Sequence, residues 1–373
     1  MAIAGTNIRL DSTEGMDKIT QTEKVTSPYF SNGATTIVGT NLVSSSLTDT
    51  NETYFFGISH TDSLTTEEFN VTFGSINGYG SKVEANTKAE TEAIYKQFAN
   101  LLLAPTEVTG GFFISSPASS PAVATGRDEE IFVLLAKRSN MKDRLNKGTW
   151  VIGLSGSDSV GVAAPLLHLA DDSSTTNPTA TPVGDRYNIV SCSSAGTNLT
   201  LAPATTRNFG FFYPDLGVMV FSAAELSSSI PGVSATAALD EVVQHKGTEL
   251  ATSQSGFAHT EDVDANYKTA LKFVNCLEGA DGKLTFRDEE DQVSAQYFCR
   301  VRSGQMNFSN SPTFISGSLN ELRQSTMKGN PTTFITSVQL YNNTGDIVAV
   351  GNLSTPLKKN FSSEATIKVK LTY

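Results

Sequence analysis

The C-terminal stretch 297–373 constrains the fold more than any other part of this chain, because strand and turn signals fill it. An alternating pattern over 334–340 predicts a strand, and the Asn- and Gly-containing run 342–346 predicts the turn that follows. The apolar run 347–350 is then expected to return as a fully buried strand. In the final strand, 367–372, apolar residues alternate with lysines, which predicts a half-buried strand protected against uncontrolled edge pairing. The side chains expected on one face of the first strand are those of Phe334, Thr336, Val338 and Leu340.

Strand signals recur earlier in the chain and are often ended by glycine. Residues 131–136 are predicted to form a buried strand whose partner is 150–154, after a turn at Lys147-Gly148. The other predicted strands are 54–59, 69–74 and the two halves of 209–221, which a turn at 214–217 separates.

Helical periodicity is clearest over 88–103, where Ile94, Phe98, Leu101 and Leu102 fall on one face and Pro105 ends the helix. Three further helix starts carry a capping residue. They are Ser222 before 223–226, Ser234 before a helix carrying Leu239, Val242 and Val243 that stops at Gly247, and Asp264 before a helix carrying Leu271, Val274 and Leu277 that stops at Gly279.

These signals predict an α+β, β-rich fold, with antiparallel sheets or sandwich-like modules and a few short helices. At 373 residues the chain is expected to hold more than one domain. We expect a polar N-terminal arm with Pro28-Tyr29-Phe30 as its anchor, ordering on a partner. The expected divisions are the arm 1–45, a β-rich domain 46–165 with the helix 88–103, a second β/α segment 166–255, and a helix plus β-hairpin module 256–373.

A net charge of −11 argues against a nucleic-acid-binding groove, which needs clustered Lys and Arg. The basic cluster within 137–147 is better interpreted as a solvated face. No apolar run has the length of a membrane span and no signal peptide opens the chain, so we expect a protein made in a cytoplasm that stays soluble. The three cysteines, Cys192, Cys276 and Cys299, fit reduced and buried thiols better than disulfides or a zinc site.

No motif that we weighed supports catalysis or metal binding. The elbow-like Gly153-Leu154-Ser155-Gly156 has Ser157 where the second glycine of G-x-S-x-G is required. The loop 277–288 resembles a calcium loop but has Leu277 and Gly279 at the first two ligand positions, so a helix end followed by a strand explains it better. The acidic run 288–291 is interpreted as a solvated loop rather than an ion site. The four scattered histidines, interpreted as surface or structurally satisfied residues, are His60, His168, His245 and His259.

A series of structural motifs nevertheless recurs in a familiar order, and it is most specific in the C-terminal third. It includes Tyr54-Phe55-Phe56-Gly57-Ile58-Ser59, Phe212-Tyr213-Pro214-Asp215-Leu216-Gly217, Tyr297-Phe298-Cys299-Arg300, Asn307-Phe308-Ser309-Asn310-Ser311-Pro312, Asn330-Pro331-Thr332-Thr333-Phe334 and Leu353-Ser354-Thr355-Pro356-Leu357. Over roughly residues 50–373 the chain resembles virion structural proteins of contractile-tailed bacteriophages.

The resemblance implies a non-enzymatic virion protein, present in multiple copies, that binds other virion proteins of the baseplate, tail tube, sheath or neck. It implies no cofactor, no catalytic, cofactor-binding or metal-binding residue, and no nucleic-acid or membrane partner. We expect a baseplate wedge component; a neck, collar or capsid-associated protein is the alternative. A third alternative is a tail module that binds host-surface glycans by stacking sugars on Trp150, Phe212 and Tyr213, although these aromatic residues fit a core better.

Overall fold

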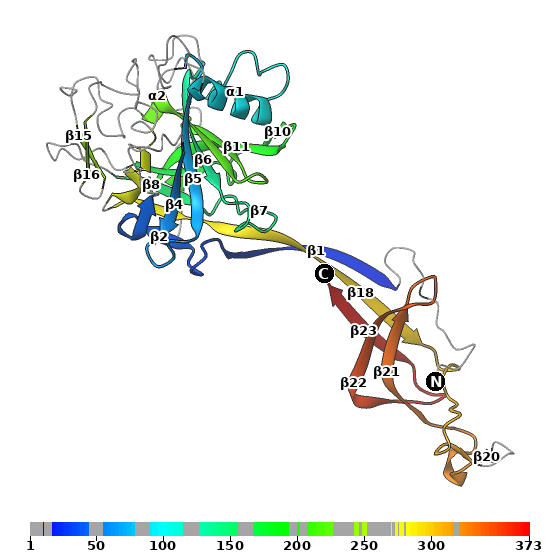
Figure 1. Cartoon of the computed structure of the whole chain (residues 1–373). Helices are drawn as coiled ribbons and strands as arrows, with labels where there is room; N and C mark the ends of the chain where they lie inside the picture. The colour runs from blue at the N-terminus through cyan, green and yellow to red at the C-terminus, as the bar shows by residue number, and fades with distance from the viewer. Residues whose placement is uncertain are drawn as a thin grey trace. The chain divides into compact units, whose positions relative to one another are not determined.

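The computed structural model describes residues 10, 17–44, 55–78, 90–114, 127–155, 167–193, 200–201, 207–226, 242–245, 248–251, 270, 273–274, 276–279, 281–316 and 321–373. The chain divides into two compact units (Figure 1). Unit 1 combines Met1–Lys24 with Asp291–Tyr373, and unit 2 is Val25–Glu290. Unit 1 therefore brings both ends of the chain together, whereas the divisions expected from the sequence were four consecutive ranges.

Unit 2 is built on a 13-stranded sheet in which every strand pair is antiparallel. Its main path runs β2 (Thr36–Val38), β17 (Lys283–Thr285), β8 (Val151–Leu154), β9 (Leu167–Asp171), β11 (Gly184–Ser193), β13 (Gly210–Tyr213), β14 (Val218–Ser222), β6 (Glu130–Ala136), β5 (Glu67–Ser75), β4 (Phe55–His60) and β3 (Leu42–Ser44). Two short strands, β10 (Thr179–Thr181) and β12 (Thr200–Leu201), also pair with β11.

The two ends of this path are neighbours in the sequence, so the sheet is nearly closed. Only the short 3-10 turn η1 (Gly39–Asn41) separates β2 from β3. A closed sheet has one face turned inward, and each strand of the path contributes an apolar side chain to a single buried cluster. The cluster includes Ile37, Leu42, Phe56, Phe69, Phe132, Ile152, Leu169, Ile189, Phe212, Met219 and Leu284.

Helical residues fill part of this interior. Ala270, Phe273, Val274, Cys276 and Leu277 are helical and fully buried, and Phe273 stacks on Phe132 with ring centroids 5.2 Å apart. The helix ends at the predicted Gly279, where a Cβ would overlap a backbone oxygen of the segment after β8. A strand, β17, follows, which confirms the interpretation of 277–288 as a helix end and a strand.

The predicted amphipathic helix is α1 (Glu90–Leu102), which covers the outer face of the sheet (Figure 1). Tyr95, Phe98 and Leu102 are buried there against alternate residues of β6, β13 and β14. Leu101, expected on the apolar face, is exposed, because the buried face follows the 91, 95, 98, 99 and 102 positions. The short helix α2 (Ala223–Leu226) begins as predicted, with the amide of Glu225 donating to the Ser222 hydroxyl.

Unit 1 contains small, open sheets. The bounds of the strands and turns outside the 13-stranded sheet are β1 (Lys18–Pro28), β7 (Arg144–Leu145), β15 (Val242–His245), β16 (Thr248–Ala251), β18 (Arg287–Val301), β19 (Ile315–Ser316), β20 (Glu321–Leu322), η2 (Ser325–Met327), β21 (Thr333–Tyr341), β22 (Ile347–Lys359) and β23 (Ala365–Thr372). Strands β1, β18 and β23 form one sheet, with β7 paired to the start of β18 inside unit 2. Strands β21 and β22 form a separate hairpin (Figure 1).

The β-rich, antiparallel fold class is confirmed. Three local predictions are wrong. Strand β8 pairs with β9 and β17, not with β6. Residues 242–245 pair with 248–251 as a β-hairpin and do not form a helix, in keeping with the β preference of the two adjacent valines, Val242 and Val243. Residues 18–44 form strands β1, β2 and β3 rather than an arm, although the expected anchor holds, since Tyr29 and Phe30 are buried.

Candidate assembly surface

The β21–β22 hairpin has two different faces, because residues paired across an antiparallel ladder point to the same side. Leu340 pairs with Ala349 and Val338 with Gly351; these positions define face A of the hairpin. On face B, Gln339 pairs with Val350 and Tyr341 with Ile347.

A bulge between Ile335 and Ser337 changes which residues share a face. At this irregularity one residue of β21 lies opposite four residues of β22, and the alternation of burial along β21 changes phase. Phe334 was predicted to lie with Val338 and Leu340, but it is 57% exposed whereas those two residues are half-buried. Ile335 is half-buried, like Val338 and Leu340 on face A. The prediction of one shared face is therefore wrong for Phe334, because simple alternation does not foresee a bulge.

The returning strand is not buried, contrary to the prediction for 347–350. Ile347, Val348 and Val350 are 57%, 60% and 58% exposed. The hairpin is a two-stranded sheet, and within the described residues no further strand pairs with either of its edges. A consecutive apolar run indicates burial but does not say which chain provides the cover.

The base of the hairpin is held by a buried lysine. Lys359 is 0% exposed, and its ammonium donates to the carbonyls of Ser303 and Asn360 and to Asn307 Oδ1, at 2.8–2.9 Å. An ammonium has three N–H donors, so all of them are used. Across the ladder, the Thr333 hydroxyl donates to the carbonyl of Met306 at 2.5 Å. These contacts fix the point at which the hairpin leaves the rest of unit 1.

The tip of the hairpin is held by a side-chain network. Asn342 Oδ1 accepts the amides of Thr344 and Asp346 and the Thr344 hydroxyl at 2.7–3.0 Å. Hydrogen bonds from Thr344 and Asn342 keep the pKa of the Asp346 carboxyl below its ordinary value. Gly345 takes a φ of 91°, in the left-handed region that favours glycine. The predicted turn at 342–346 is confirmed.

The hairpin carries almost no charge. From 333 to 357 its one charged residue is Asp346, in the turn. Strand β21 contains no proline or glycine either, so its irregular register is the only one of the usual edge-protecting devices that it has. By contrast β23 alternates Lys368 and Lys370 with half-buried residues, as predicted. An uncharged hairpin with open edges is suited to contact with another chain.

Unit 1 as a whole buries little apolar surface. The described apolar residues that it buries are Ala295, Val301, Phe314 and Ala365, and both large buried clusters belong to unit 2. Its exposed large apolar side chains are Ile19, Phe308, Phe334, Tyr341, Ile347, Val348, Val350, Leu357, Phe361 and Tyr373.

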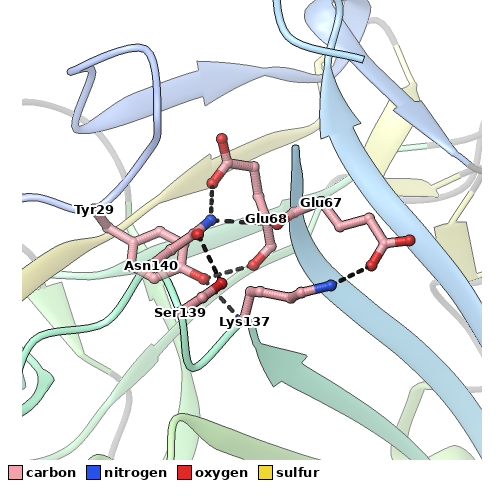
Figure 2. Close-up of polar contacts among 6 residues, drawn as sticks. All are labelled: Tyr29, Glu67, Glu68, Lys137, Ser139 and Asn140. Atoms are coloured by element: carbon pink, nitrogen blue, oxygen red, sulfur yellow. Dashed lines mark hydrogen bonds and ion pairs between the residues drawn. The ribbon is translucent and has the colours of Figure 1, made fainter. Parts of the chain in front are cut away.

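Unit 2 contains buried polar clusters, and one of them surrounds Glu68 on β5 (Figure 2). Its carboxylate is fully buried and accepts the amide and hydroxyl of Ser31 and Asn140 Nδ2. Its backbone carbonyl accepts the Tyr29 hydroxyl at 2.5 Å and the Lys137 amide at 3.0 Å. Burial raises the pKa of Tyr29 well above its ordinary value. Both carboxylate oxygens have partners, so the cluster joins three segments of unit 2 and offers no open acid for chemistry.

The acidic run 288–291 is part of β18 rather than a solvated loop, which corrects the prediction. Asp288 and Glu289 are buried, and burial raises the pKa of Asp288 to about 7. Glu289 accepts Asn146 Nδ2 at 2.6 Å and lies 3.7 Å from Arg144 Nε. Successive strand residues point to opposite faces, so these two carboxyls do not form an acid–base pair.

The other residues weighed from the sequence do not converge on a site. His60 is buried on β4 and its Nδ1 accepts the Asp62 amide, while His168 lies on β9; the side chain of His245 and all of His259 lie outside the described residues. Gly153 and Leu154 belong to β8, and residues 156–157 are outside the described part. No group of three or more His, Cys, Asp or Glu residues with metal-site geometry occurs among the described residues.

The aromatic residues considered for sugar stacking are core residues. Trp150 and Phe212 are 0% exposed and pack edge-to-face, with centroids 5.2 Å apart, and Tyr213 is buried beneath α1. None of the three cysteines forms a disulfide; Cys276 is buried and the other two are half-buried. Within the basic cluster, Lys137 pairs with Glu67 and Lys142 with Glu290, so it is no free cationic patch.

Comparison with known proteins identifies no relative: no family model, no curated protein and no solved structure matches this chain. In the part of the chain that the structure describes, no helix has the length and apolarity needed to cross a membrane.

Proposed function

We propose that this chain is a structural protein of a contractile-tailed bacteriophage virion, a baseplate component that acts by assembling with other virion proteins. The observation that carries the proposal is the composition of unit 1, which exposes its large apolar residues and buries few. The resemblance of the C-terminal motifs to phage virion proteins suggests that the assembly is a virion, and those motifs lie in unit 1.

The energetics are compatible with a role in assembly. Burying a large apolar side chain contributes about 1.5–3 kcal/mol, so covering the exposed side chains of unit 1 would contribute on the order of 10 kcal/mol. That is comparable to the roughly 4–15 kcal/mol that association costs in lost freedom. An assembled particle provides such cover for every copy.

Immunogold labelling and a protein inventory of purified particles test the proposal directly. Cross-links from this chain to tail-tube or sheath proteins would support the baseplate position, and cross-links to portal or capsid proteins would move it to the neck or head. Absence of the chain from purified particles would refute the virion assignment.

A truncation that removes 365–373 tests the part played by unit 1. Strand β23 pairs with residues 294–301 of β18, so its loss leaves that ladder open. We expect the truncated chain to remain outside particles while unit 2 stays folded, as reported by the fluorescence of the buried Trp150. Normal incorporation of the truncated chain would contradict this role.

A further inference from the structure

One edge of strand β23 is open. The strand pairs with β18 on one side, and no other described strand pairs with it on the opposite side. At its end, Tyr373 and Val293 exchange two hydrogen bonds, at 2.9 and 3.0 Å. In an antiparallel ladder such pairs alternate with pairs that exchange none. Every second residue of β23, counted back from Thr372, therefore directs its backbone amide and carbonyl away from β18.

Four residues of β23 turn their backbone groups to the open edge, and we call them the outer-edge residues: Thr366, Lys368, Lys370 and Thr372. Phe298 provides a check on this assignment, because it lies opposite Lys368 and its amide donates to the carbonyl of Asp17 rather than to β23. Within the described part of the chain, nothing bonds to the backbone amides and carbonyls of the outer-edge residues. Such an edge is a template for one more strand.

The side chains of the outer-edge residues are exposed, and two of them are cationic. The Lys368 ammonium lies 6.0 Å from the centre of the Phe298 ring, and neither Lys368 nor Lys370 forms an ion pair with a described residue. Arg300, opposite Thr366, adds a cation to the same face, with Asp17 at 3.5 Å from its Nε. This face of the sheet therefore has more positive charge than its own acids balance.

The charge of unit 1 differs in sign from that of the whole chain. Unit 1 contains 11 Lys and Arg residues and 8 Asp and Glu residues, a net charge of +3, whereas the whole chain carries −11. A positively charged region attracts acidic partners and repels basic ones as they approach. The charge of unit 1 and the lysines at its open edge therefore favour the same kind of partner.

The lysines make the open edge selective. A neutral or basic strand that paired here would leave the ammonium groups without a counter-charge or would oppose like charges, which is why edge lysines discourage pairing. A strand with Asp or Glu opposite each lysine gains about 0.2–1 kcal/mol for each cross-strand pair instead. Between the lysines, Val369 points to the other face and is half-buried, so an apolar residue suits the position opposite it.

We infer that the open edge of β23 binds an antiparallel strand of another protein, with Asp or Glu opposite Lys368 and Lys370 and an apolar residue opposite Val369. The inference rests on the proposed assembly function and deepens it by stating the chemistry of one partner. At about 3.3 Å per residue, the edge from Thr366 to Thr372 is about 23 Å long. Backbone hydrogen bonds along this length provide the affinity, and the two charged positions provide the selection.

The probe is a fluorescently labelled peptide, Thr-Val-Glu-Val-Glu-Val-Thr, whose binding to the full-length chain is followed by fluorescence anisotropy. Two control peptides carry Gln or Lys in place of both Glu residues. A third keeps both Glu residues but has N-methyl groups on their amides, which block the ladder and leave the charge unchanged. The chain variants are the double substitution Lys368→Glu and Lys370→Glu, and the control Lys328→Glu at an exposed lysine elsewhere in unit 1.

We expect the Glu peptide to bind the wild-type chain and the Lys328→Glu control equally, about 10-fold more tightly than the Lys peptide, with the Gln peptide between them. N-methylation should abolish binding. The doubly substituted chain should prefer the Lys peptide, and this reversed preference also shows that its edge is still folded. The bound Glu peptide should slow amide exchange at Lys368 and Lys370 but not at Val369, whose amide already faces β18.

Four results would overturn the inference: no binding of the Glu peptide, equal binding of the Glu and Lys peptides, equal binding of the N-methylated peptide, or protection from exchange outside the open edge. Equal binding of the N-methylated peptide would show that charge attraction alone holds the ligand. Each of these results leaves the virion proposal standing, whereas absence of the chain from particles would refute that proposal without affecting peptide binding.

Discussion

Replacing Glu68 by alanine should lower the free energy of unfolding of unit 2 by about 3–5 kcal/mol, because it removes buried hydrogen bonds to a carboxylate and leaves their donors without a partner. The substitution removes the acceptor of three hydrogen bonds, from the amide and hydroxyl of Ser31 and from Asn140 Nδ2. Hydrogen bonds to charged groups contribute about 1.5–3 kcal/mol each, and donors left without a partner add their own desolvation cost. Glu68→Gln should cost less, about 1–2 kcal/mol, because its amide nitrogen would face the Asn140 donor.

The adjacent residue provides a matched control. Glu67 lies on the same strand but forms a 2.6 Å ion pair with Lys137 in which both side chains are more than a third exposed. Solvent screens such a pair, so Glu67→Ala should change the free energy of unfolding by at most about 0.5 kcal/mol.

The assay is urea denaturation followed by Trp150 fluorescence. Trp150 is the single tryptophan of the chain and is fully buried in unit 2, so its signal reports that unit. Equal losses for Glu68→Ala and Glu67→Ala would refute the conclusion that the Glu68 network holds the three segments together.

Two further predictions concern a buried acid and a buried lysine. Burial raises the pKa of Asp288 to about 7, so the folded state binds a proton that the unfolded state releases above its ordinary pKa of 3.8. Unit 2 should therefore unfold at a higher urea concentration at pH 6 than at pH 8. Asp288→Asn should reduce this difference between the two urea midpoints. A variant that shows the same difference as the wild-type chain would contradict the prediction. Lys359→Met removes three hydrogen bonds at the hairpin base, so we expect faster amide exchange in β21 and β22. Lys358→Met, at the exposed neighbouring position, is the control and should leave exchange unchanged. Equal effects of the two substitutions would show that the Lys359 ammonium does not anchor the hairpin.

Local signals in the sequence predicted the elements that depend on local interactions. Gly217, with a φ of 68°, closes the predicted turn between β13 and β14, and Ser222 caps the helix that follows. The helix α1 and the turn at 342–346 were also predicted, since periodicity and turn residues act over a few positions.

Features that depend on distant residues were not predicted. The partners of β8 are selected by closure of the sheet, which no local pattern around Trp150 reveals. The Glu68 network joins residues 37 and 72 positions apart, and a lone Glu in a strand gives no sign of it. For the candidate surface, the apolar pattern of 347–350 was recognised but its exposure was not, because apolar runs look alike whether their own chain or another one covers them.

The nearly closed sheet has a consequence for synthesis on the ribosome. The β2–β3 segment that completes the ring emerges early, yet β2 must wait for β17, whose Thr285 hydroxyl lies 3.0 Å from that of Thr36 across 249 positions of sequence. At a synthesis rate of roughly 5–20 residues per second, β2 stays without its partner β17 for about 10–50 s, and during this time its edge can pair with other nascent chains. Protecting that interval, rather than the stability of the finished ring, is expected to limit the yield of folded protein.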